Sequence, residues 1–295
     1  SVAGAFAPDG SGAGTLRVAA VQGGGLRGLR AVDRPPPPVV NAHLRATAGI
    51  APGSVDLVLL PEDVIDVEGP IGGSPEDEAV AEVARRLATT VVAGVVEDVG
   101  EDRFRNAAVA WDASGVRVAR YDKVHRVPFG EYVPARSLVD RVADLSAIPR
   151  DALPGRGSGL LATPAGPMAV VISFEVFFPD RTRAAVQAGG QVLLVPTNAS
   201  SYRDDQVPAQ EVAAARLRAL ETGRWVVQSA PTGYSAVIDQ RGRVVALSGL
   251  GGAEVLEEEI GRRTGHTVLT RLGPAPTVVL AVLGLAGSWA RRKKS

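Results

Sequence analysis

The stretch that decides the fold class is GPMAVVISFEVFFPD, residues 166–180. It begins with a nearly continuous apolar run that ends at Ser173, and Phe174, Glu175 and a proline then lead toward an expected helix. Such a run is typical of a central strand in a sheet that helices cover. A small hydroxyl residue at a strand-to-helix elbow is a usual position for a nucleophile. Ser173 could instead simply cap the following helix.

Outward from this stretch, strands and helices alternate from Leu16 onward, and together they predict an α/β fold with a sheet covered by helices. One helix is expected behind SPEDE (74–78), with Val80 to Leu87 on its apolar face, and a second after Pro208, with Ala213, Leu217 and Leu220 on its apolar face. The expected strands are LRVAAVQ (16–22), VDLVLLP (55–61), TTVVAGVVE (89–97), RNAAVAW (105–111), GPMAVVIS (166–173), QVLLVP (191–196), RWVVQSAP (224–231), YSAVID (234–239) and GRVVAL (242–247).

The two ends of the chain differ from this core. Residues 1–15 are small and polar without periodicity, which predicts a linker, and Pro35–Pro38 predict a short polyproline II stretch. Residues 274–290 carry no charge and are followed by RRKK, which predicts a transmembrane helix and a basic cytoplasmic tail within 266–295. The folded domain, 16–265, would then lie on the extracytoplasmic face of the cell membrane. The alternative for 274–290 is a buried C-terminal helix.

Composition excludes several functions. Lys and Arg number 32, as do Asp and Glu, so no net charge favours binding to nucleic acid. There is no cysteine, which excludes disulfides and thiolate metal sites, and the three scattered histidines make a metal site unexpected. Lys123 is the single lysine outside the last three residues, among 29 arginines. A compact ammonium in place of the wide guanidinium fork suggests a position where arginine does not fit.

Three further residues are candidates for chemistry. Glu62 follows the strand VDLVLL, and ligands gather at the carboxyl ends of strands in α/β sheets. Lys123 and Glu131 lie in RYDKVHRVPFGEYVP (120–134), where proline, glycine, aromatic and charged residues are crowded, as in functional loops. Each residue also has an ordinary interpretation: a helix-start acid for Glu62, a solvated charge for Lys123 and a surface carboxylate for Glu131.

Taken together, Glu62, Lys123 and Ser173 resemble the Glu-Lys-Cys triad of the nitrilase superfamily. The matching motifs are LPED, YDKVHRVPFGEYVP and VISFEVFFPD, and LLVPTNASSY with the segment after it is also similar to the apolipoprotein N-acyltransferase branch. The resemblance covers roughly residues 16–290. It implies an αββα sandwich, two mixed sheets with helices outside. The family has cysteine at the position of Ser173, and it begins with membrane helices that this sequence lacks.

The resemblance also implies a reaction without cofactor or metal. An acyl chain passes from a membrane phospholipid to the nucleophile, and then to the N-terminal amine of a diacylglyceryl-modified lipoprotein. Glu62 would act as the base, Lys123 would stabilise the oxyanion, Glu131 would orient Lys123, and Phe174 and Glu175 would shape the elbow. With Ser173 as nucleophile, turnover should be severely reduced. The alternatives are a nitrilase-like amidase acting on a small amide and a non-catalytic module that binds lipid or a partner.

Overall fold

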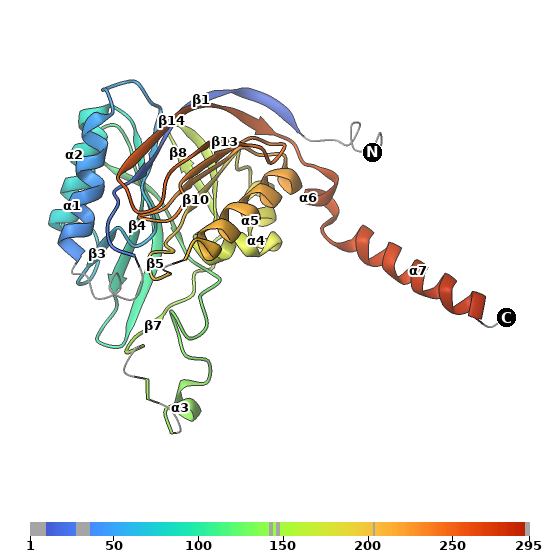
Figure 1. The fold of residues 1–295 in the computed structure, drawn as a ribbon. Coiled ribbons are helices and arrows are strands. Elements are labelled where there is room, and N and C mark those ends of the chain that lie inside the picture. Colours follow the sequence, from blue (N-terminus) through green and yellow to red (C-terminus); the bar gives the residue numbers. More distant parts are fainter. Residues whose placement is uncertain (1–9, 28–35, 142–143, 146–147, 203, 293–295) are drawn as a thin grey trace.

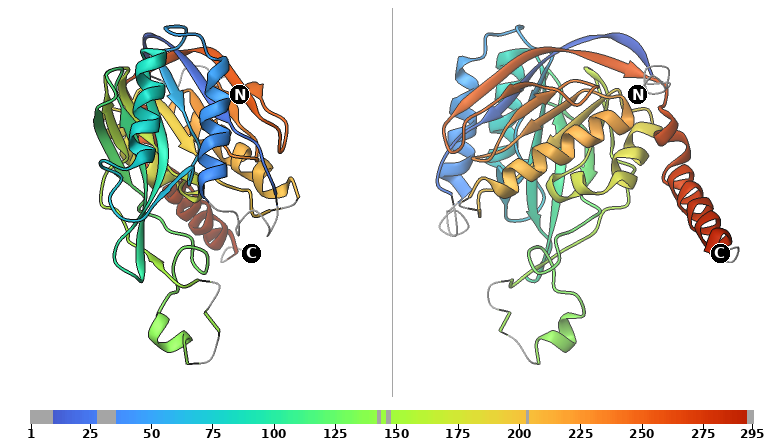
Figure 2. Two further views of the ribbon diagram at one scale, coloured as in Figure 1. Left: turned by 90° about the vertical axis from the view of Figure 1, so that its left-hand side faces the viewer. Right: turned by 45° about the vertical axis from the view of Figure 1, so that its right-hand side comes forward.

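Two β-sheets packed face to face, with helices on both outer sides, make up the protein (Figure 1). The computed structural model describes residues 10–27, 36–141, 144–145, 148–202 and 204–292. Two further views show the helices on either side of the paired sheets (Figure 2). The predicted αββα sandwich is therefore confirmed.

The first sheet is mixed and holds the N-terminal half of the domain. Its order is β14-β1-β2-β4-β5-β6, with β3 paired to β4 and β7 paired to β5. β1, β2 and β4 run parallel, whereas β14, β5 and β6 pair antiparallel with their neighbours. The strands are β1 (Ser11–Gln22), β2 (Leu57–Leu59), β3 (Ile65–Val67), β4 (Thr90–Asp98), β5 (Arg103–Trp111), β6 (Arg117–Asp122), β7 (Asp151–Ala152) and β14 (Glu254–Thr264).

The second sheet has the order β13-β12-β11-β10-β9-β8. Its central strands β9, β10 and β11 are parallel, so their carboxyl ends meet at one edge. The strands are β8 (Leu160–Thr163), β9 (Gly166–Val170), β10 (Val192–Pro196), β11 (Val226–Ser229), β12 (Ala236–Ile238) and β13 (Val244–Leu247). All nine strands expected from the sequence are present, and β3, β6, β7, β8 and β14 are additional.

Helices cover the outer faces of both sheets. The helices are α1 (Pro36–Ala46), η3 (Thr47–Gly49), α2 (Pro75–Leu87), α3 (Arg136–Val139), η4 (Ser173–Phe177), α4 (Pro179–Gln187), α5 (Gln206–Thr222), α6 (Val268–Leu272) and α7 (Ala275–Arg292). The start predicted at SPEDE is confirmed, because the Ser74 hydroxyl accepts a hydrogen bond from the Asp77 N–H at 3.0 Å and Pro75 occupies the first turn.

Three apolar cores correspond to the three interfaces between the four layers. One lies between the first sheet and α2, and includes Val58, Leu87 and Trp111. A second joins the two sheets and includes Leu59 and Ile172. The third lies between the second sheet and the helices α4 and α5. Burial on both faces explains why the central strands are nearly continuous apolar runs.

Two expectations near the N-terminus need correction. β1 begins at Ser11 and not at Leu16, because residues from Ser11 to Thr15 pair with β14, so the predicted linker over 1–15 is wrong for this part. Residues 1–9 and Pro35 lie outside the described residues. Pro36 to Pro38 form the first turn of α1, not a polyproline II stretch, since proline is tolerated where backbone N–H groups have no helical partner.

The apolar face predicted for α5 is also wrong. Ala213, Leu217 and Leu220 are exposed, the two leucines at 54% each. The face packed on the second sheet instead carries smaller or polar residues, namely Glu211, Val212, Ala215, Arg218, Ala219 and Thr222. Close packing against the sheet requires small side chains, and this requirement outweighed the greater hydrophobicity of leucine.

The predicted transmembrane helix over 274–290 finds no support. Among the described residues, no helix combines the length and hydropathy that a membrane span requires. α7 covers this segment but takes Arg291 and Arg292 into its last turn. Its uncharged part, 275–290, is about 24 Å long at 1.5 Å per residue, against roughly 30 Å of hydrocarbon. Lys293 and Lys294 lie outside the described residues.

The burial pattern leads to a test with matched leucines. Replacing Leu59, which is fully buried between the sheets, by alanine should lower the free energy of unfolding by about 2–5 kcal/mol. The exposed Leu217 replaced by glutamine should change it by less than about 0.5 kcal/mol. Urea denaturation measures both. A large loss for Leu217→Gln would mean that α5 packs with the opposite face inward.

Candidate active site

A buried cluster of charges lies where the first sheet ends. The Lys123 ammonium donates hydrogen bonds to Glu62 Oε1 at 2.7 Å and to Glu131 Oε1 at 2.8 Å. The side-chain amide of Asn106 donates to the same two carboxylates, at 2.8 and 3.1 Å. Glu131 Oε2 accepts the Val127 N–H at 2.7 Å, which closes the loop around the lysine. One cation is thus held between two carboxylates and cannot move away from them.

Local backbone packing brings these groups together. Glu62 is the third residue after β2, and the backbone there lies against Gly94 of β4, whose N–H donates to the Pro61 carbonyl at 3.0 Å. A Cβ at Gly94 would lie 2.4 Å from the Pro61 oxygen and 2.5 Å from the Glu62 Cα. Glycine is therefore required at this point of β4. Lys123 follows β6, and its N–H donates to the Asn106 carbonyl at 2.9 Å.

The electrostatics of the cluster favour the ionised pair. Burial raises the pKa of Glu62, and the adjacent Lys123 charge opposes that shift. Burial alone would lower the pKa of Lys123, but the charges of Glu62 and Glu131 hold it above its ordinary value. Lys123 therefore stays protonated at neutral pH. An ammonium has three N–H donors, of which two are used by the carboxylates among the described residues.

The elbow after β9 places Ser173 in a sparsely populated backbone conformation. Its φ is +46°, which costs energy for any residue other than glycine and is common at functional sites. The Ser173 hydroxyl is buried and donates to Glu211 Oε1 at 3.2 Å, and it also accepts from the Thr197 hydroxyl at 3.2 Å. Among the described residues, no hydrogen bond joins Ser173 to Glu62 or Lys123.

Glu175 connects the elbow at Ser173 to the loop that follows Lys123. Its fully buried carboxylate accepts backbone N–H groups of Val124 and His125, at 2.9 and 3.0 Å, and that of Ile172 at 2.9 Å. The Tyr121 hydroxyl also donates to it, at 2.8 Å. Because Val124 and His125 directly follow Lys123, Glu175 fixes the elbow relative to the charge cluster. Its role in shaping the elbow, expected from the sequence, stays a prediction.

Phe174 begins a small aromatic group beside the elbow. Its ring packs edge-on against Phe178 with centroids 5.0 Å apart, and Phe178 in turn contacts His125 at 4.5 Å. The rings of Phe174, Phe178 and His125 thus pack in a row beside the turn after Ser173. The role of Phe174 in shaping the elbow stays a prediction.

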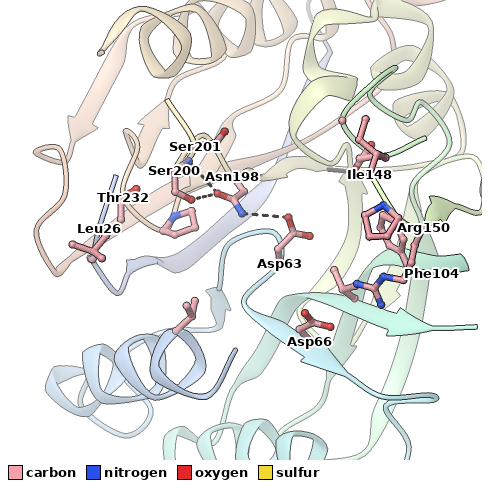
Figure 3. A pocket seen from close by; sticks show the side chains of 18 residues that line it. Leu26, Asp63, Asp66, Phe104, Ile148, Arg150, Asn198, Ser200, Ser201 and Thr232 are labelled. Carbon is pink, nitrogen blue, oxygen red and sulfur yellow. Dashed lines mark hydrogen bonds between the residues drawn. The ribbon is translucent and has the colours of Figure 1, made fainter. Parts of the chain in front are cut away.

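A cavity of about 460 Å³ adjoins the charge cluster through Glu131 (Figure 3). Asp63, next to Glu62, lines it and accepts a hydrogen bond from the Asn198 amide at 3.2 Å. Burial, followed by the charge of Glu62, raises the pKa of Asp63 well above its ordinary value. Apolar side chains of Leu26 and Phe104 line the same space, whereas Ser173 does not. No set of three or more metal-binding side chains was found in the described part of the chain.

The structure brings the predicted residues into one region, but it groups them differently. Glu62, Lys123 and Glu131 are hydrogen-bonded to one another, while Ser173 bonds to Glu211 and Thr197, which the sequence analysis missed. Asn106 was missed as well. Thr197 could have been found, because it follows β10, the parallel neighbour of the strand before Ser173. Glu211 gave a weaker signal, a lone acid among apolar residues near the start of α5.

Comparisons with known proteins show the family and the fold of the chain. The family model for carbon-nitrogen hydrolases matches residues 17–267, and the chain belongs to this family. Two solved structures share the fold: Nit3 of Saccharomyces cerevisiae, from branch 10 of the nitrilase superfamily, with a TM-score of 0.63, 20% identity, and coverage of 86% of this chain and 92% of the other; and an amidase from Nesterenkonia sp., with a TM-score of 0.60, 21% identity, and coverage of 83% and 90%.

Within the family, the sequence is similar to apolipoprotein N-acyltransferases. The enzyme of Synechocystis sp. is 36% identical over 183 residues, which are 62% of this chain and 35% of that protein. The enzyme of Mycolicibacterium smegmatis is 29% identical over 293 residues, which are 94% of this chain and 49% of that protein. The chain therefore spans between a third and a half of the length of these relatives.

The role of Glu175 in connecting the elbow to the loop after Lys123 can be tested by measuring the stability of variants. In Glu175→Gln, one oxygen is replaced by an amide NH₂ that faces N–H donors, so the free energy of unfolding should fall by about 2–5 kcal/mol. Tyr121→Phe removes one of its donors and should cost about 1 kcal/mol. Chemical denaturation measures both variants. A Glu175→Gln protein within 0.5 kcal/mol of the parent, on the order of a surface change, would contradict this role.

Proposed function

We propose that residues 16–265 form the catalytic domain of an N-acyltransferase. The domain moves an acyl chain from a membrane phospholipid, through an acyl-enzyme on Ser173, to the N-terminal amine of a diacylglyceryl-cysteine lipoprotein. The proposal is based on the buried Glu62–Lys123–Glu131 cluster, which lies beside the elbow where Ser173 has a strained backbone conformation. Similarity to proteins named apolipoprotein N-acyltransferases supports this reaction over the others of the family.

Each side chain has a role that follows from its contacts. Glu62 acts as a general base in the site, and its raised pKa suits proton exchange. Lys123, with an elbow backbone N–H, stabilises the negative oxygen of the tetrahedral intermediate through its remaining N–H donor. Glu131 holds Lys123 protonated and oriented, and the Asn106 amide keeps both carboxylates in place. Phe174 and Glu175 keep the elbow in position.

Ser173 in place of cysteine lowers turnover under this proposal. A thiol is partly ionised near neutral pH and is intrinsically more nucleophilic than a hydroxyl. An oxyester also passes its acyl group to an amine less readily than a thioester does. Both steps of the reaction are therefore slower with serine.

A location at the cell membrane, with the domain on the extracytoplasmic face, is part of the proposal because both substrates carry acyl chains. Exposed apolar side chains of α7 support contact with lipid, for example Leu280 at 70% and Leu285 at 72% exposure. Leu138, at 61% exposure, belongs to α3, which extends away from the sandwich (Figure 1), and Phe129, at 60% exposure, lies in the loop that carries Glu131. The apolar side chains of the cavity, such as Leu26 and Phe104, suit an acyl chain.

The decisive variant is Ser173→Cys, supplied with phospholipid as the only acyl donor. Intact-protein mass spectrometry should show an added acyl mass that hydroxylamine removes, as it removes a thioester. A diacylated lipopeptide added afterwards should take up this acyl group on its α-amine. In the same background, Lys123→Arg should slow acylation by at least ~100-fold, the scale for loss of one oxyanion donor.

The alternatives give different results in this experiment. Ser173→Ala serves as the control that cannot form an acyl-enzyme. A cysteine variant that binds phospholipid yet never gains the acyl mass would favour a non-catalytic lipid-binding module. Release of ammonia from a small amide, without acyl transfer from phospholipid, would favour an amidase. Normal acylation in Lys123→Arg would reduce Lys123 to a structural role.

A further inference from the structure

Glu211 is a buried acid that the proposed reaction does not use. It projects from the second turn of α5 toward the elbow and is 4% exposed. Its Oε1 accepts hydrogen bonds from the Thr197 hydroxyl at 2.5 Å and from the Ser173 hydroxyl at 3.2 Å. No cation forms an ion pair with it in the part of the chain that the structure describes. A buried carboxylate held only by two hydroxyls destabilises the fold and therefore suggests a function.

The contacts of the two acids near the elbow differ. Glu62 Oε1 is bonded to Lys123 and Asn106, whereas Glu211 Oε1 is bonded to the Ser173 oxygen itself. A general base must lie within about 2.6–3.2 Å of the group whose proton it takes, or reach it through one water. Glu211 meets this distance criterion, because its Oε1 lies 3.2 Å from the Ser173 oxygen. Glu62 has no direct hydrogen bond to Ser173 among the described residues.

We propose that Glu211 is the catalytic base for Ser173, so that the site divides its proton transfers between two carboxylates. As the Ser173 oxygen forms a bond to the ester carbonyl carbon, its proton moves to Glu211 and the carbonyl electrons move onto the oxygen. When the intermediate collapses, the carbonyl re-forms, the ester C–O bond breaks and the departing alcohol oxygen takes the proton from Glu211. Glu62 then serves the later step, in which the amine attacks.

Thr197 positions Glu211 for this step. It is fully buried, follows β10, and its backbone N–H is fixed by the Ser229 carbonyl at 2.9 Å. Its hydroxyl contacts both Glu211 Oε1 and Ser173 Oγ, so the three oxygens form a closed triangle. This arrangement keeps the carboxylate on the serine side and away from solvent.

The charge state of Glu211 is compatible with a base near neutral pH. Burial raises its pKa to about 7, the Thr197 and Ser173 hydroxyls oppose the shift, and among the charged groups Glu62 raises the pKa while Lys123 lowers it. A base is most effective when its pKa lies near the working pH. Reaction of Ser173 should therefore increase with pH through about 7, as Glu211 loses its proton.

The inference rests on Ser173 being the nucleophile of the proposed function, but its test needs neither lipid nor acceptor. A fluorophosphonate probe reacts with activated serine hydroxyls, forming an O–P bond and releasing fluoride. The full chain should be labelled at Ser173, with a rate that rises with pH around a midpoint near 7. Glu211→Gln, which keeps the shape and an acceptor oxygen, should slow labelling by ~100-fold or more and abolish that midpoint.

Two controls separate a catalytic role from a structural one. Glu221→Gln removes a partly buried acid from the same helix and should change labelling by less than about threefold. In the Ser173→Cys background, alkylation by iodoacetamide should depend on Glu211 by less than ~10-fold, because a thiol ionises without strong help. A purely structural role would produce equal losses in both backgrounds.

The outcomes distinguish this inference from the proposed function. Unchanged labelling in Glu211→Gln, or labelling of the parent chain no faster than Ser173→Ala, would overturn the role of Glu211. The pH profile is measured on the parent chain, so the test remains valid even if a variant folds poorly. A profile without a midpoint near 7 would also overturn the role of Glu211. Glu211-dependent labelling without acyl transfer from phospholipid in Ser173→Cys would refute only the acyltransferase reaction.

Discussion

The interaction on which the site depends is the buried ion triad of Lys123 with Glu62 and Glu131. Removing three charged groups from water is costly, and only short hydrogen bonds on every side compensate for it. The 2.7 and 2.8 Å contacts, together with the Asn106 amide, supply these bonds. Because the triad tolerates little displacement, the ends of β2 and β6 and the loop that carries Glu131 must meet at one place, which fixes this edge of the first sheet.

The second half of the site comes from the other sheet, and Glu175 connects it to the triad. Glu175 binds backbone N–H groups on both sides of the gap, next to Lys123 and next to Ser173. The serine elbow, with Thr197 from the adjacent parallel strand and Glu211 from α5, forms its own hydrogen-bonded group. The two groups interact through charge, since Glu62 and Lys123 both influence the pKa of Glu211.

The sequence predicted the strands well, because buried parallel strands must be apolar throughout and are bounded by turn residues. It predicted the buried face of α5 incorrectly, because Leu217 and Leu220 suggested a core that close packing assigns to smaller residues. Glu62, Lys123 and Ser173 could be found from the ends of strands and a crowded loop. Glu211 could not be found in this way, because its contact with Ser173 depends on how a helix and two strands pack in space.

The most direct test of the account is a comparison of unfolding free energies around Lys123. Lys123→Met alone leaves two buried carboxylates without their cation and should lower the free energy of unfolding by about 3–5 kcal/mol. Combining it with Glu62→Gln and Glu131→Gln neutralises the cluster, and the triple variant should recover more than half of that loss. A triple variant as unstable as Lys123→Met would show that the mutual charge compensation of these three side chains does not hold this edge of the fold together.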